Sequence, residues 1–147
     1  MSSENNRFLQ WKNKWSHPDE MDEFEYISSN VHPEDFLITK ELLFPVLVEH
    51  DDGIFLHKNF SIELYQNMLR RNKKDIEKDF NAFKVFELFE GCNETVNEET
   101  FEAIGKLIQQ SWTYYLKSKF PDKNILVELI IDESNYGPIV RFYQQEI

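Results

Sequence analysis

The chain has 147 residues, enough for one domain with a sizeable hydrophobic core, and 13 Phe, 6 Tyr and 3 Trp supply material for that core. The formal net charge of −11 disfavours nucleic acid and anionic membranes as partners. The one cysteine excludes an intramolecular disulfide, no apolar run approaches the roughly 20 residues of a membrane span, and residues 1–6 lack a signal-peptide pattern, so we expect a cytoplasmic protein.

The N-terminal third predicts short helices between breaks. Aromatic residues at helical spacing indicate a helix over residues 7–15, and Pro33 with two following acids indicates another over residues 33–43. The acidic stretch 19–29 is compatible with a loop or a short helix. We interpret the aromatic side chains as core, with a contact patch as the alternative; they are Phe8, Trp11, Trp15 and Phe24. We expect residues 1–6 to be disordered.

The middle of the chain begins with a predicted β-hairpin. Residues 45–49 and 54–58 flank an Asp-Asp-Gly turn, which we expect to pair residue 48 with 57 and residue 50 with 55. Ser61 predicts the start of a helix that either continues through residues 70–79 or breaks at Asn72. The aromatic stretch 83–89 is interpreted as a third strand, although a helix also fits its pattern.

The last third gives the clearest pattern. Asn97 predicts the start of a helix that ends at Pro121, with an apolar stripe at three- and four-residue spacing. Residues 125–131 predict a strand that is covered on both faces or lies centrally in a sheet. A turn over residues 132–137 then leads to a strand over residues 139–144. We therefore expect a single α+β domain over residues 1–147, with a mostly antiparallel sheet of about five strands backed by a single layer of helices.

Few residues suggest chemistry. The predicted register would bring His50 and His57 diagonally together on one face of the hairpin, but no metal-binding spacing accompanies them, and His17 and His32 are equally isolated. Cys92 lies in an acidic loop, an unfavourable setting for a nucleophilic thiolate. The chain has no phosphate-binding glycine loop and no nucleophile motif. We expect no catalytic residue, no metal ligand and no cofactor.

Charge is distributed unevenly. Residues 19–52 hold eleven carboxylates and one lysine, a local charge of −10, whereas residues 58–84 hold seven bases and four acids. We predict that a basic protein partner binds the acidic stretch and the hairpin tip, through Asp19, Glu20, Asp22, Glu23, Phe24, Glu25, Tyr26, Glu49, Asp51 and Asp52. The basic run at residues 70–74 is read as a solvated helix end that balances the acidic face, with RNA binding as the alternative.

The layout of the chain from the Asp-Gly hairpin through the aromatic stretch 83–89 to the C-terminus resembles that of small, uncharacterised bacterial single-domain proteins. The resemblance is carried by residues 120–123 leading into 125–131, and by Tyr136-Gly137-Pro138 leading into residues 140–144. Some small acidic proteins of this kind are immunity proteins, which neutralise a neighbouring toxin. The resemblance implies a non-enzymatic immunity or inhibitor protein for a basic toxin such as a nuclease, as a monomer or weak dimer.

Two alternative functions remain open. One is a small hydrolase or ligand-binding enzyme that uses scattered carboxylates with His50 or His57. The other is a housekeeping or phage-encoded adaptor in which the acidity only maintains solubility.

Overall fold

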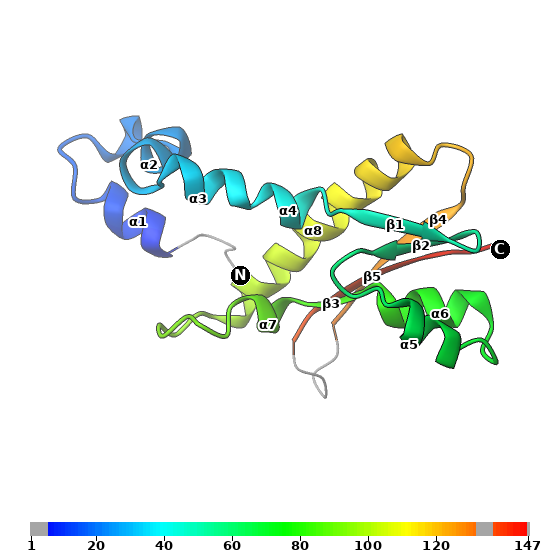
Figure 1. Cartoon of the computed structure of the whole chain (residues 1–147). Coiled ribbons are helices and arrows are strands. Elements are labelled where there is room, and N and C mark those ends of the chain that lie inside the picture. Colours follow the sequence, from blue (N-terminus) through cyan, green and yellow to red (C-terminus); the bar gives the residue numbers. More distant parts are fainter. Residues whose placement is uncertain (1–5, 132–136, 147) are drawn as a thin grey trace. The chain divides into compact units, whose positions relative to one another are not determined.

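The computed structural model describes residues 6–131 and 137–146 (Figure 1). The chain divides into two compact units, unit 1 (Met1–Lys40) and unit 2 (Glu41–Ile147), and each is described by itself. The turn predicted over residues 132–137 lies outside the described residues apart from its last position. The same holds for the predicted disorder of residues 1–6, except that Asn6 begins the first helix, α1.

Unit 1 consists of short helices, two of which begin at a side-chain cap. They are α1 (Asn6–Lys12), the 3₁₀ helix η1 (Pro18–Glu20), α2 (Glu23–Asn30) and α3 (Pro33–Ile38). The Asp22 carboxylate accepts a hydrogen bond from the Glu25 N–H at 2.9 Å and so starts α2, while the His32 ring caps α3. None of the described residues of unit 1 is buried. The interpretation of its aromatic residues as core is therefore wrong.

The helix predicted over residues 33–43 is interrupted. The Thr39 hydroxyl donates to the Phe36 carbonyl at 2.6 Å, a local bond that competes with the helical pattern. The short helix α4 (Lys40–Leu43) follows at the boundary between the two units.

Unit 2 contains five antiparallel strands in two small sheets, with helices packed against them, which confirms the predicted α+β class. The strands β1 (Leu47–His50) and β2 (Gly53–Leu56) form the hairpin. The strands β3 (Ala82–Lys84), β4 (Ile125–Ile130) and β5 (Ile139–Gln144) form the second sheet, in the order β3–β5–β4. Strand β5 is central and β4 is an edge, because β3 pairs with β5 and not with β4. Of the two alternatives for residues 125–131, the central position in the sheet is therefore wrong.

The hairpin register differs from the predicted one. Val48 pairs with Phe55 and His50 with Gly53, because the turn is made by Asp51 and Asp52, which both have positive φ. Aspartate tolerates this left-handed conformation, so glycine is not needed in the turn. Gly53 serves packing instead: a Cβ there would lie 2.6 Å from the Phe55 ring.

The long helix α8 (Glu98–Lys119) confirms the predicted boundaries and packs across the β4–β5 side of unit 2. The Asn97 side-chain oxygen caps it by accepting a hydrogen bond from the Thr100 N–H at 2.9 Å. From the predicted stripe, Ile108, Trp112 and Leu116 are buried. Gly105 allows close approach to the sheet, since a Cβ there would meet Leu129 at 2.8 Å. The Trp112 indole N–H donates to the Leu42 carbonyl at 2.8 Å. The main hydrophobic cluster also takes in Val85 and buried residues of β2, β3, β4 and β5.

The structure resolves two alternatives that the sequence left open, one for residues 61–79 and one for residues 83–89. Helix α5 (Ile62–Asn67) ends before Asn72, which caps a separate helix α6 (Lys73–Phe80) through the Asp75 N–H. The stretch 83–89 is only partly a strand: β3 ends at Lys84, and α7 (Val85–Leu88) follows. The stretch changes form because its second half packs Phe86 and Phe89 against Phe101 of α8.

Helix α6 supplies buried polar side chains that join the two sheets. The Glu77 carboxylate accepts hydrogen bonds from the Ile54 N–H of β2 at 2.9 Å and from the Gln144 N–H of β5 at 2.8 Å. Asn81, one turn later, accepts from the Leu56 N–H and donates to the carbonyls of Ile54 and Phe142. Glu77 of α6 and Asn81, which follows this helix directly, thus satisfy backbone groups of both β2 and β5.

Candidate interaction surfaces

The acidic segment, residues 19–26, occupies η1 and α2 of unit 1. Its five carboxylate residues are all exposed, and within the described part of the chain none of them takes part in an ion pair. Asp22 has a structural role as well, because it caps α2. The other four carboxylates, those of Asp19, Glu20, Glu23 and Glu25, have no hydrogen bond of their own among these residues and are available to a cationic partner.

The two aromatic residues of the acidic segment differ in availability. The Phe24 side chain is 82% exposed, which is unusual for so large an apolar group. Tyr26 is half-buried because its ring packs edge-on against Phe8 and Trp11, with centroid distances of 5.9 and 5.3 Å. Phe24 is therefore the better anchor for a partner, and Tyr26 mainly holds α1 against α2.

The second predicted contact, the tip of the hairpin, belongs to unit 2. Glu49, Asp51 and Asp52 are exposed there. The Asp51 carboxylate lies 3.5 Å from the His50 imidazole, and His50 packs edge-on against the Tyr65 ring at 4.8 Å. Burial, and then the charge and hydrogen bonding of Asp51, raise the pKa of Tyr65. Because the acidic segment and the tip lie in different units, each is treated as a separate surface.

The histidines are not brought together. His50 is at the turn end of the hairpin, whereas the His57 N–H bonds to the Val46 carbonyl at the opposite end. Among the residues that the structure describes, no group of three His, Cys, Asp or Glu side chains is placed to hold a metal ion. Cys92 is exposed, and its sulfur lies 3.7 Å from the Glu94 carbonyl oxygen.

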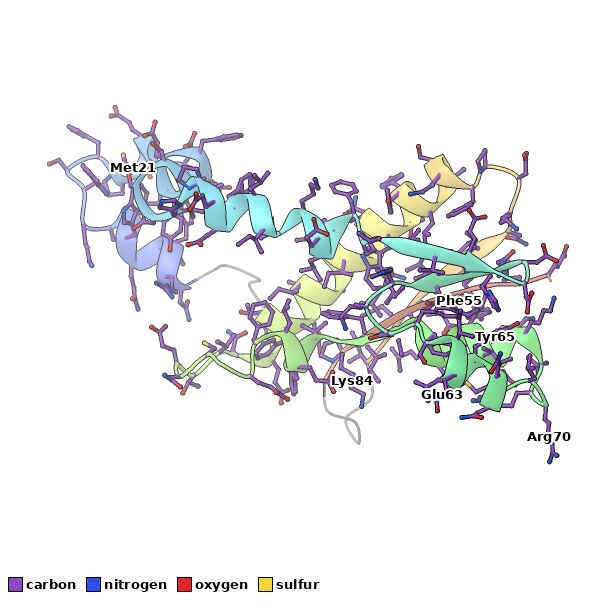
Figure 2. All side chains as sticks on the ribbon, viewed as in Figure 1. Met21, Phe55, Glu63, Tyr65, Arg70 and Lys84 are labelled. Atoms are coloured by element: carbon purple, nitrogen blue, oxygen red, sulfur yellow. The ribbon has the colours of Figure 1, made fainter. Side chains whose placement is uncertain are left out.

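Two of the four bases in the run at residues 70–74 contact other groups of unit 2. Arg71 pairs with Asp79, and the Lys73 ammonium donates to the Asp51 carbonyl at 3.2 Å. Arg70 is exposed and points outward from the loop after α5 (Figure 2). These contacts favour the interpretation of the run as a charged helix end.

A polar triad lies across β4 and β5, and the sequence interpretation did not identify it. Glu128 accepts hydrogen bonds from the Arg141 guanidinium at 2.7 Å and from the Tyr143 hydroxyl at 2.9 Å. Burial alone would raise the pKa of Glu128, but these two bonds together with the positive charges of Arg141 and Lys78 outweigh it, and the pKa is lowered. Burial, followed by the Glu128 bond, raises the pKa of Tyr143. Residues 128, 141 and 143 alternate on one face, so the antiparallel register would have indicated this contact.

A cavity of about 510 Å³ lies where β3, α7 and α8 meet in unit 2. It is lined by Lys84, Phe86, Glu87, Glu90 and Phe101. Sequence reasoning missed it, because it depends on the change from strand to helix at Val85.

In the described part of the chain, no helix has the length and apolar character needed to cross a membrane. Comparison with models of known protein families, with curated proteins and with solved structures finds no significant match. The resemblance to small bacterial proteins, and the immunity function that it implies, therefore stay predictions.

Proposed function

We propose that this chain is a non-enzymatic acidic binding protein that neutralises a basic protein, in the manner of an immunity or inhibitor protein for a toxin such as a nuclease. The observation that carries the proposal is the acidic segment of unit 1. Its carboxylates have no cationic partner among the described residues, and Phe24 stands 82% exposed among them.

The carboxylates and the phenyl ring of the acidic segment would affect binding in different ways. Unpaired carboxylates attract a basic partner and raise its association rate, an effect that salt screens over about 8 Å at physiological ionic strength. An exposed phenyl ring that enters a pocket on the partner loses its contact with water and slows dissociation. Glu49, Asp51 and Asp52 at the hairpin tip would form a second acidic contact, and the cytoplasm would be the site of action.

The test begins with affinity capture by the full chain and identification of the bound protein by mass spectrometry. Surface plasmon resonance at low and high salt then compares the wild type with a triple variant, Glu20→Lys, Glu23→Lys and Glu25→Lys, which keeps the Asp22 cap. We expect association to slow at least tenfold and to lose most of its salt dependence.

A matched control reverses three exposed carboxylates of unit 2, Glu63, Asp122 and Glu146, and so changes net charge equally. The control should retain most of the wild-type association rate. Phe24→Ala should mainly speed dissociation, by roughly tenfold for an anchor of average strength. Salt-insensitive association that neither triple variant changes would rule out the acidic segment as the interface.

A further inference from the structure

The cavity in unit 2 has an aromatic wall with acidic groups at its edge. Phe86 of α7 and Phe101 of α8 meet edge-on, with ring centroids 4.7 Å apart. Both rings are half-buried, and both line the cavity. The volume of about 510 Å³ falls in the range of small-molecule sites. This wall can cover the apolar body of a small ligand.

The charges around the cavity favour a cation. Among the described residues, Glu87 and Glu90 line it with one base, Lys84, whose ammonium lies 3.9 Å from the Glu87 carboxylate. Glu90 is exposed and has no ion pair within the described part of the chain. Residues 87–102 include the lining residues Glu87, Glu90 and Phe101, and this stretch holds six carboxylates and no base. A cation at this position gains from the carboxylate and from the negative faces of the phenyl rings.

From these features we infer that the cavity binds a small organic ammonium ion. Its apolar body lies against Phe86 and Phe101, and its charged group meets Glu90. Lys84 neutralises Glu87 and competes for the same charge. The site lies wholly in unit 2, so it does not depend on the function proposed for unit 1.

The test uses two probes with the same ring and chain, 2-phenylethylammonium and the neutral 2-phenylethanol. Each is titrated into the full ¹⁵N-labelled chain at constant ionic strength and followed by amide chemical shifts. We expect the ammonium probe to bind roughly three- to tenfold more tightly than the alcohol, with shifts centred on Phe86, Glu90 and Phe101.

Three variants separate this site from general charge attraction. Glu90→Gln should remove the preference for the ammonium probe, and Lys84→Gln should increase it by about twofold or more. Glu63→Gln removes one exposed carboxylate from α5, in another part of unit 2, and should leave the preference unchanged (Figure 2). Equal binding of the two probes by the wild type would overturn the assignment. So would equal losses in Glu90→Gln and Glu63→Gln.

Discussion

Unit 1 and unit 2 are each stabilised by a different kind of interaction. Unit 2 encloses both hydrophobic clusters of the described chain, one around Trp112 and one around Phe55. The described residues of unit 1 bury no side chain and expose Phe24, Phe36, Leu37 and Ile38. Unit 1 therefore depends on helix caps and one aromatic cluster, which contribute about 1 kcal/mol each, whereas each large buried side chain of unit 2 contributes several times more. Most of the stability of the chain therefore comes from unit 2. The exposed apolar side chains of unit 1 remain available for binding.

The largest test of this comparison removes one tryptophan from each unit. Trp112 is 2% exposed and donates a hydrogen bond to Leu42, so Trp112→Ala should lower the free energy of unfolding by about 3–5 kcal/mol. Trp11 is half-buried in the aromatic cluster of unit 1, and Trp11→Ala should cost about 1 kcal/mol or less. Urea unfolding followed by circular dichroism measures both. Equal losses would show that unit 1 has a core of its own.

A second test compares the loss of a buried polar side chain in unit 2 with the loss of an exposed one in unit 1. Asn81 is fully buried, and Asn81→Ala leaves the Leu56 N–H and the carbonyls of Ile54 and Phe142 without their partner. We expect a loss of about 2–3 kcal/mol in unfolding free energy. Asn30→Ala is the matched change in unit 1, where the Asn30 amide donates to the Tyr26 carbonyl on an exposed surface. That variant should change the stability by less than about 0.5 kcal/mol.

The smallest expected effect depends on pH. The folded-state pKa of Glu128 is lowered, so its bonds to Arg141 and Tyr143 add stability above the ordinary carboxyl pKa of 4.5, and that stability is lost as pH falls through the folded value. At pH 7, Glu128→Gln should cost about 1 kcal/mol, and the gap to wild type should narrow below pH 4.5.

Urea unfolding at pH 7 and at several acidic values measures this gap. Glu23→Gln removes one exposed carboxylate from unit 1 and controls for the change in net charge. A gap that is constant across these pH values would show that the Glu128 bonds act through packing and not through charge.

Local signals in the sequence were sufficient for much of the fold. Asn97 and Pro121 bound α8 because a cap and a proline act on their neighbours alone. The strand order could not be obtained in this way, since it depends on β3 pairing with β5 across more than fifty residues. The stretch 83–89 was misread for a related reason: its pattern fits strand and helix alike, and packing on Phe101 decides the outcome.

The candidate surfaces were predictable to different degrees. Carboxylate density alone located the acidic segment, but the exposure of Phe24 and the packing of Tyr26 required the structure. The role of Glu77 was hidden because α6 looks like a solvated charged helix. A usable signal exists in retrospect: Glu77 and Asn81 fall on the helical stripe of the buried Ile76 and Phe80.

The bonds from Glu77 and Asn81 to β2 also bear on self-association through strand pairing. An unpaired strand edge invites pairing with a strand of another molecule, which is a route to aggregation. On β2, the outward N–H groups of Ile54 and Leu56 are already occupied by Glu77 and Asn81. A second chain would have to displace buried, hydrogen-bonded side chains before it could add a strand there. The same two residues that join the sheets thus oppose strand addition at the free edge of β2 as long as α6 remains folded.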